Sequence, residues 1–309
     1  MKKFIIKTLL LILPLVVLAI SVEYLLRKIP NDYSYKKSYL DTHSEKIQIL
    51  ILGHSHTYLG VDPTLFAQNT FNAAHTAQTF DFDLEIFNKY RKKFTDLKII
   101  IIPISYFSFW LRIDELTKTP LKHNYVIYYG TRAKCWRDYS EFLIKTPKQQ
   151  KDNLYMYYFN KKDNIYCTPL GHARFDRLPK IADLEEDGKQ IAARHTCDNI
   201  YSEEKIKIFT NRVEILESFA EFCNQNNVKL ILLTTPTYYT YRKNLNMEQL
   251  HKMFETINNF VQQHNGVQYI NYHEDSTFTT DDFYDATHLN QNGATKLSIK
   301  LANYIDSLR

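Results

Sequence analysis

The sequence predicts an α/β protein in which a parallel sheet lies between two layers of helices. Short apolar runs that suit buried strands alternate with longer segments whose apolar residues recur at helical spacing. The clearest strand, residues 47–52, ends at Gly53, and a comparable run spans residues 98–104. Strands separated by helices pair in parallel through right-handed crossovers. With 309 residues, 44% of them hydrophobic, the chain can form one sizeable domain with an insertion, or two small domains.

The first part of this core is expected to run β-α-β-α-β. After the strand at residues 47–52, Asp62 precedes a proline and predicts a helix start, because proline already has the φ of a first helical turn. A short second strand is expected at residues 70–73. Apolar residues at helical spacing between Phe80 and Phe94 predict the next helix, and residues 98–104 predict the third strand.

The same alternation resumes near residue 205 and continues to the end of the chain. Asn246 is a suitable N-cap, and the helix after it is expected to end before Gly266. The sequence therefore predicts a three-layer, flavodoxin-like arrangement. The expected elements are a helix at residues 209–223, a strand at 228–233, the helix after Asn246, a strand at 268–270 and a closing helix at 297–308.

Four segments follow from these patterns. Residues 105–204 break the alternation and are rich in tyrosine, which predicts an insertion at the C-terminal edge of the sheet. Most of its aromatic residues are expected to form a small core of their own, while exposed ones can stack on sugar rings. The segments are an N-terminal signal anchor at residues 1–28, a tether at 29–45, the core at 46–104 and 205–309, and the insertion at 105–204.

The N-terminus indicates export. Three lysines among the first seven residues precede an uncharged stretch from Thr8 to Val22, which reaches membrane-spanning length if flanking charges extend to the membrane surface. A cleaved signal peptide is the alternative, because Ala19-Ile-Ser21 is an acceptable cleavage site. The apolar pattern continues to Leu26 and favours a retained single-pass anchor. Its N-terminus would be cytoplasmic and the domain that follows the anchor extracytoplasmic.

Charge and cysteine content argue against two other classes of protein. The formal net charge is +5 without a dense basic run, so no nucleic-acid partner is expected. The four cysteines form no Cys-x-x-Cys pair, which argues against a structural zinc site. Cys223 is expected to be a core thiol on the apolar side of its helix. Cys167 and Cys197 flank a polar loop and are one candidate pair, but four cysteines allow three complete pairings.

A candidate nucleophile follows the first strand directly. Ser55 lies two residues after Gly53, at the edge of the sheet where open α/β proteins bind ligands. A serine hydroxyl needs a base, and a neutral imidazole needs an acceptor that fixes its tautomer. Asp285 and His288, in one loop before the closing helix, can supply both. We therefore expect Ser55, His288 and Asp285 to form a catalytic triad.

The Gly-x-Ser block at Ser55 and the Asp-x-x-His block at Asp285 and His288 resemble those of the SGNH/GDSL hydrolase superfamily. Its membrane-anchored branch of envelope acyltransferases, with D-alanyl transfer and alginate acetylation proteins, is the most similar. The resemblance covers the core segments. His54 stands where the family usually has aspartate, and no Gly-x-Asn-Asp block follows the third strand. The resemblance implies a cofactor-independent reaction, with the oxyanion held by the Ser55 backbone N–H and the Asn72 amide.

Together, the resemblance and the N-terminus imply an exported, membrane-tethered serine esterase or O-acyltransferase. Its expected substrates are acyl groups of cell-envelope or exported polysaccharide. A transferase would also need a membrane partner that supplies the acyl donor. The alternative is a catalytically inactive SGNH-like carbohydrate-binding protein, which the missing oxyanion blocks favour.

A metal site is a further alternative. His54, His56 and His75, together with Asp285 and His288, are suitable ligands for a divalent cation. No tight His-x-x-x-His spacing supports such a site, so we expect no metal. The histidines at positions 54, 56 and 75 are instead expected to line the pocket beside Ser55.

Overall fold

The computed structural model of the chain describes residues 1–117, 121–133, 135–177 and 183–308. It contains two compact units. The smaller unit comprises Met1–Lys37 and Pro120–Ile165, and the larger comprises Ser38–Thr119 and Tyr166–Arg309.

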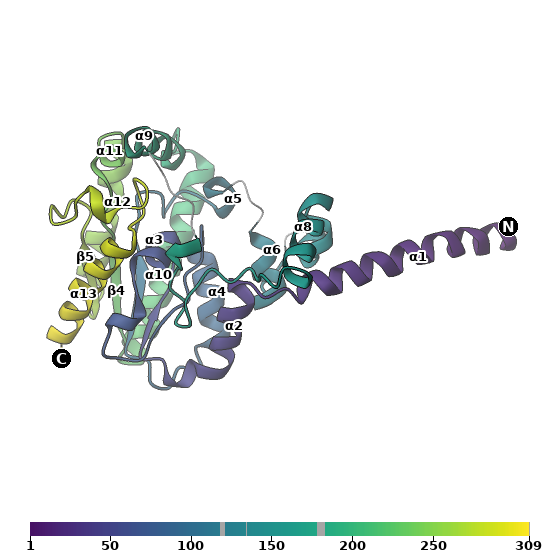
Figure 1. Cartoon of the computed structure of the whole chain (residues 1–309). Coiled ribbons are helices and arrows are strands. Elements are labelled where there is room, and N and C mark those ends of the chain that lie inside the picture. Colours follow the sequence, from purple (N-terminus) through teal and green to yellow (C-terminus); the bar gives the residue numbers. More distant parts are fainter. Residues whose placement is uncertain (118–120, 134, 178–182, 309) are drawn as a thin grey trace. The chain divides into compact units, whose positions relative to one another are not determined.

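The larger unit is built on a parallel sheet of five strands, which confirms the predicted α/β class (Figure 1). The strand order β2-β1-β3-β4-β5 places β1 and β3 next to each other in the middle. Because all strands are parallel, their C-terminal ends meet at one edge of the sheet. The strands are β1 (Ile49–Ile51), β2 (Thr70–Asn72), β3 (Ile99–Pro103), β4 (Lys229–Thr234) and β5 (Val267–Asn271).

Helices cover the sheet and give the larger unit its layers. The longer ones are α4 (Phe80–Tyr90), α10 (Glu203–Gln225), α12 (Met247–Gln263) and α13 (Gln291–Ser307). The Asn246 side chain caps α12, as predicted. The helix expected after Asp62 is only a 3-10 turn, Pro63–Leu65. The unit also contains α9 (Leu184–His195) and the short helices α3 (Ser55–Gly60), α5 (Ile113–Leu116) and α11 (Tyr239–Arg242).

Alternation along the strands divides the core between the two faces of the sheet. Ile49 and Ile51 of β1 pack in one cluster with Leu297 and Leu301 of α13. The intervening Leu50 must point to the other face, because successive side chains of a strand alternate. It is also fully buried. Burial of one such aliphatic side chain stabilises the fold by about 1.5–3 kcal/mol, so both faces contribute to the stability of the sheet.

The smaller unit begins with α1 (Lys2–Arg27), which includes the predicted uncharged stretch. Among the described residues it is the one helix long and apolar enough to cross a membrane. Large apolar side chains from Phe4 to Ile20 are exposed along it. Its last turns pack on neighbouring helices, where Glu23 accepts hydrogen bonds from Ser140 Oγ (2.8 Å) and from the Phe142 N–H (2.7 Å). These contacts fix the end of α1 within its own unit.

Aromatic residues form the centre of the smaller unit. Tyr125 is fully buried and meets the ring of Tyr33 edge-on at 5.2 Å. Tyr128 accepts a hydrogen bond from the Asn31 side chain at 2.7 Å. This core therefore joins part of the expected insertion to residues before it, and other aromatic residues of the insertion, such as Trp136 and Tyr155, are exposed. The helical segments of this unit are α1, the start of α2 (Asp32–His43), α6 (Lys122–Asn124), a π turn at Tyr125–Tyr129, a 3-10 turn at Trp136–Tyr139, α7 (Glu141–Ile144) and α8 (Pro147–Tyr158).

The structure differs from the sequence-based expectations for the tether, the insertion and the cysteine pair. Residues 29–45, expected as a tether, contain α2 and a 3-10 turn at Ser44–Lys46. Residues 105–204, expected as one insertion, are divided between the two units. All four cysteines are free, so the structure has no Cys167–Cys197 disulfide, and the expected core thiol Cys223 is buried.

Candidate active site

A tight turn at Gly53 carries the chain from β1 into α3. Gly53 has a φ of 101°, and a Cβ placed there would lie 2.1 Å from Pro103 Cγ at the end of β3. Only glycine fits both constraints without strain. The Gly53 N–H donates to Asp83 Oδ1 at 2.7 Å. Burial raises the pKa of Asp83 to about 7, against the opposing effects of its hydrogen bonds from Gln78 and Gly53.

Ser55 is the first residue of α3, directly after this turn. His54 is the N-cap, and its Nδ1 accepts from the His56 N–H at 3.3 Å. The Ser55 hydroxyl therefore lies at the C-terminal edge of the sheet, next to the first turn of a helix. The residues that the structure describes provide no backbone acceptor for the Ser55 N–H.

The structure brings Ser55, His288 and Asp285 together. His288 Nε2 lies 2.7 Å from Ser55 Oγ, and His288 Nδ1 lies 2.7 Å from Asp285 Oδ2. The other carboxylate oxygen, Oδ1, accepts backbone N–H groups of Thr287 and His288, each at 2.8 Å. An ionised Asp285 can only accept, so His288 carries its hydrogen on Nδ1. His288 Nε2 is then free to accept the serine proton.

The electrostatics of the pair match this arrangement. Burial alone would raise the pKa of Asp285, but the His288 imidazole and the backbone N–H groups outweigh it and lower that pKa. Burial alone would lower the pKa of His288, but the Asp285 carboxylate outweighs it and raises that pKa. Asp285 is therefore ionised at neutral pH, and it stabilises a positive charge on His288.

A cavity of about 240 Å³ opens beside the Ser55 hydroxyl. Helix α9 supplies one of its walls through Asp187, Ile191, Arg194 and His195, which lie on one helical face. The other lining residues come from α3, the loop after β2, the segment after β3 and the His288 loop. They are Ser55, His56, Thr76, Ala77, Phe107, Leu116, Thr117, Asp285, Thr287 and His288.

Two contacts hold α9 against this site. Asp187 Oδ2 accepts the Ala286 N–H at 2.8 Å, which connects the helix to the loop that carries Asp285 and His288. Gly188 lies so close to α11 that an added Cβ would be 2.2 Å from Thr240 Oγ1. A side chain at position 188 would therefore displace α9 relative to α11 and disturb this wall of the cavity.

Of the three histidines that were predicted to line the pocket, one does so and two are buried away from it. His56 lines the cavity, and its ring meets that of His288 edge-on at 5.1 Å. His54 and His75 are buried and are not among the cavity-lining residues. Nε2 of His54 is sealed in the protein without a hydrogen-bond partner, and burial, reinforced by His288, lowers the pKa of His54 to about 3.

Asn72 has a different set of partners from those expected. Its amide nitrogen donates to the carbonyls of Thr57 (2.8 Å) and Val61 (3.0 Å), and its Oδ1 accepts the Ala74 N–H at 3.1 Å. An amide nitrogen has two hydrogens, and both are used here. In this arrangement Asn72 holds the end of α3 and has no N–H left for an oxyanion.

Sequence reasoning did not select His195 or Ser105, both of which lie at this site. His195 lines the cavity, and its Nδ1 lies 2.9 Å from the Tyr241 hydroxyl. Ser105 Oγ lies 2.8 Å from Nδ1 of His56. The position of Ser105, directly after β3 at the C-terminal edge, was a signal that could have identified it. His195 lies in a segment without a recognisable motif, so its sequence offered none.

Two further observations concern alternatives to a serine site. In the described parts of the chain, no three or more His, Cys, Asp or Glu side chains are arranged to hold a metal ion.

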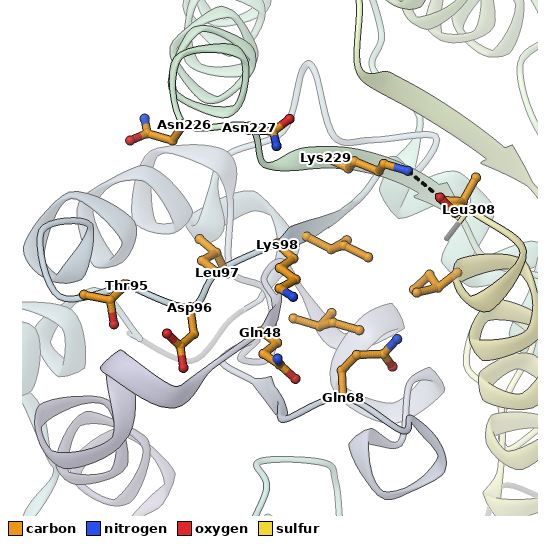
Figure 2. Close-up of a pocket in the computed structure, with 13 residues that line it drawn as sticks. Gln48, Gln68, Thr95, Asp96, Leu97, Lys98, Asn226, Asn227, Lys229 and Leu308 are labelled. Carbon is orange, nitrogen blue, oxygen red and sulfur yellow. Dashed lines mark hydrogen bonds between the residues drawn. The ribbon is translucent and has the colours of Figure 1, made fainter.

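A larger cavity, about 880 Å³, lies at the opposite edge of the sheet, near the N-terminal ends of β1, β3 and β4 (Figure 2). Figure 2 shows Lys229 Nζ donating to the Leu308 carbonyl there, at 3.0 Å. Its lining residues include no nucleophile paired with a base.

Comparisons with known proteins give structural likenesses only. No family model and no curated protein matches the sequence. The chain is similar to a GDSL-like lipase from Bacteroides thetaiotaomicron, with a TM-score of 0.43, 12% identity and coverage of 90% of this chain and 100% of the other. It is also similar to a "putative acylhydrolase" from Bacteroides fragilis, with a TM-score of 0.41, 12% identity and coverage of 88% and 96%.

A third solved structure has the same level of likeness. It is described as a "putative platelet activating factor" from Streptococcus pneumonia, with a TM-score of 0.45, 11% identity and coverage of 94% of this chain and 98% of the other. Likenesses at these scores assign no activity to the chain. The residues around Ser55 are therefore the basis for assigning its chemistry.

Proposed function

We propose that the protein is a serine esterase or O-acyltransferase of the SGNH type. The observation that carries this proposal is the unbroken path from Ser55 Oγ through His288 to Asp285, with both heavy-atom distances at 2.7 Å. All three residues line a cavity at the C-terminal edge of a parallel sheet. A hydroxyl paired with a base that a third group orients is the arrangement that activates a serine nucleophile.

The first half of the proposed reaction forms an acyl-enzyme. The Ser55 proton passes to His288 Nε2 while Oγ bonds to the carbonyl carbon of an ester. The electron pair of the C=O π bond moves onto oxygen, and this oxyanion accepts the Ser55 backbone N–H. The intermediate collapses, the ester C–O bond breaks, and the leaving alcohol takes the proton from His288.

The second half releases the acyl group. Water in an esterase, or a sugar hydroxyl in a transferase, gives its proton to His288 and attacks the acyl carbonyl. The C–O bond to Ser55 then breaks, and Oγ recovers the proton. Asp285 stays ionised throughout and stabilises the charged imidazole.

The size of the cavity favours a short acyl group. Its volume of about 240 Å³ lies below the roughly 300–1,000 Å³ that is usual for small-molecule pockets. Phe107, Leu116 and Ile191 give it an apolar side. We therefore propose that it holds an acyl group of a few carbons, while the alcohol part of the ester extends into solvent.

Helix α1 supports a location at a membrane. Its length and exposed apolar side chains fit a retained anchor, and export would place the site among cell-envelope or exported polysaccharides. We propose acyl groups on these polymers as the substrate class. A transferase would receive its acyl group from a membrane partner.

Covalent labelling of the full chain in detergent tests the nucleophile. A fluorophosphonate probe should label the wild type, and Ser55→Ala should abolish labelling because no nucleophilic oxygen remains. His288→Ala should reduce labelling by about 10⁴-fold or more, because the serine loses its base. Ser218→Ala is the matched control, since this exposed hydroxyl only bonds the Glu214 carbonyl of its own helix.

Two outcomes would contradict the proposal. One is a folded wild type that is never labelled, which would favour a binding protein without turnover. The other is equal labelling of the wild type and Ser55→Ala, which would move the reactive group elsewhere. If labelling behaves as expected, release of acetate from an O-acetylated polysaccharide, with and without added sugar acceptors, separates hydrolysis from transfer.

A further inference from the structure

The cavity has a second imidazole with an unusual setting. His56 follows Ser55 directly in the chain, lines the cavity and meets the His288 ring edge-on at 5.1 Å. Its Nδ1 lies 2.8 Å from Ser105 Oγ, at the end of β3. The reaction outlined above uses neither His56 nor Ser105. The pair therefore needs an explanation of its own.

The hydrogen bond to Ser105 fixes which nitrogen of His56 carries the hydrogen. Ser105 is only 4% exposed, and among the described residues its hydroxyl oxygen has a single hydrogen-bond partner, His56. A buried hydroxyl hydrogen without an acceptor is costly. Ser105 therefore donates to Nδ1 of His56, and the ring carries its own hydrogen on Nε2.

The ring is also held neutral. Burial, reinforced by the neighbouring histidines at positions 54, 288, 195 and 273, lowers the pKa of His56 well below its usual value. A neutral ring has a single N–H, and the bond from Ser105 assigns it to Nε2. His56 is therefore a fixed N–H donor and does not act as a base.

This N–H reaches the cavity. The described residues offer Nε2 of His56 no hydrogen-bond partner, yet it is not among the polar atoms sealed inside the protein, whereas Nε2 of His54 is. His56 lines the cavity, so an N–H that is neither sealed nor bonded is available to the space beside Ser55. The reaction needs a donor there, because the Asn72 amide is fully used by backbone carbonyls.

We propose that His56 is a catalytic residue whose Nε2–H holds the oxyanion together with the Ser55 backbone N–H, and that Ser105 is its positioning residue. This inference depends on the proposed function. When Ser55 Oγ bonds to the carbonyl carbon, the oxygen gains the π electron pair and accepts the Nε2–H hydrogen bond. No proton leaves His56, because the serine proton goes to His288. A preorganised donor of this kind acts where charge develops in the transition state.

His195 also lines the cavity and has a related arrangement, but its ring packs on Phe107 and Tyr241. Its Nδ1 lies 2.9 Å from the buried Tyr241 hydroxyl, and its ring packs on Phe107 at 4.3 Å. The His56 ring, in contrast, packs against His288, the base itself. The proximity to the reacting atoms assigns the oxyanion to His56.

The test compares variants that keep or remove the N–H. In the full chain in detergent, with p-nitrophenyl acetate as the probe, His56→Phe keeps a ring without a donor and should lower kcat by about 10²- to 10³-fold with little change in KM. His56→Gln places an amide N–H near Nε2 and should recover part of that loss. Ser105→Ala should lower kcat by about 2- to 10-fold, and Ser105→Thr, which restores the hydroxyl, should recover it.

His273→Phe is the matched control. His273 is also a buried imidazole with a hydroxyl near Nδ1, Thr237 Oγ1 at 3.3 Å, but it lines a different cavity. Burial lowers the pKa of His273 to about 4, so it too is neutral. Its replacement should leave kcat within about threefold of the wild type, since it removes a buried imidazole without touching the oxyanion.

The outcomes separate this inference from the proposed function. If Ser55→Ala is inert but His56→Phe keeps wild-type kcat, the serine chemistry stands and the role of His56 is overturned. Equal loss in His56→Gln and His56→Phe would also overturn it. A wild type without turnover or labelling would overturn both proposals. The ring nitrogens of ¹⁵N-labelled His56 give a readout independent of turnover, and a hydrogen on Nδ1 would overturn the role of Ser105.

Discussion

At the scale of single residues, the pH dependence of Ser55 reactivity should report the interaction of His288 with Asp285. His288 must be neutral to accept the serine proton, so the labelling rate should rise with pH through the His288 pKa. Burial lowers this pKa, but the Asp285 carboxylate raises it by more. The midpoint should therefore lie above the usual 6.5.

Asp285→Asn should move this midpoint to lower pH. The substitution removes the charge that raises the pKa of His288, while burial still lowers it. The plateau should also fall, by about 10⁴-fold, because Asn no longer selects the productive tautomer. The measurement is the fluorophosphonate labelling rate between pH 5 and 9. An unchanged midpoint in Asp285→Asn would mean that a group other than His288 controls the rise of the labelling rate with pH.

The sequence identified the residues of the Ser55 path because their spacing carries information. Ser55 follows a glycine-ended strand, and Asp285 and His288 lie three residues apart in one loop. The role expected of Asn72 depended on its position at the end of β2, and position alone could not show that both its amide hydrogens hold α3. His195 could not be predicted, because only the packing of α9 brings it to the cavity.

At the scale of elements, the turn between β1 and α3 should tolerate no side chain at Gly53. An added Cβ would lie 2.1 Å from Pro103 Cγ, in addition to the strain of a φ of 101°. Gly53→Ala should therefore destabilise the larger unit strongly, displace Ser55 and slow its labelling. Thermal unfolding followed by circular dichroism, together with the labelling rate, measures both effects.

Gly266→Ala separates backbone strain from collision. Gly266 also has a positive φ, 86°, but an added Cβ would meet nothing within 4 Å. Gly266→Ala should lower the free energy of unfolding by only about 1–2 kcal/mol, and the labelling rate should not change. Combining Gly53→Ala with Pro103→Ala should restore part of the lost stability, because the colliding ring atoms are removed. Equal stability of Gly53→Ala and Gly266→Ala would show that the Pro103 ring can shift to make room for the added Cβ at little cost.

Periodicity predicted most elements of the larger unit. The five strands were expected within a few residues of their observed ends, since buried parallel strands are short, continuous apolar runs. The helix expected between Phe80 and Phe94 ends earlier, at Tyr90, although the apolar spacing continues. Phe94 is still buried, so its pattern reflects packing of a loop against the core. Apolar spacing alone does not distinguish these cases.

At the scale of the whole molecule, the N-terminus should remain attached in the mature protein. α1 continues without interruption through the candidate cleavage site at Ala19-Ile-Ser21, and Glu23 is bonded to Ser140 and Phe142 in the same unit. Membrane fractionation followed by N-terminal sequencing should find a membrane-bound chain that still contains residues 1–21. A mature chain that starts at Val22 would show that the segment is a cleaved signal.

The division into units was beyond what the sequence could show. Residues 105–204 differ from the core in composition, which predicted one insertion. The structure places residues 120–165 with the N-terminal helix, and residues 105–119 and 166–204 with the core, where α9 forms a wall of the cavity. Such a division depends on contacts between segments far apart in the chain, such as Asp187 with Ala286. Composition carries no record of these contacts.

The state of the cysteines gives the protein a built-in attachment point for spectroscopy. Three of the four thiols are buried, and Cys135, in the smaller unit, is the exposed one. A maleimide dye added to the native protein should therefore react at a single position. Paired with a fluorescent phosphonate on Ser55 in the larger unit, it would form a donor–acceptor pair. Energy transfer between the two dyes would then follow the separation of the units in a lipid bilayer, without engineered cysteines.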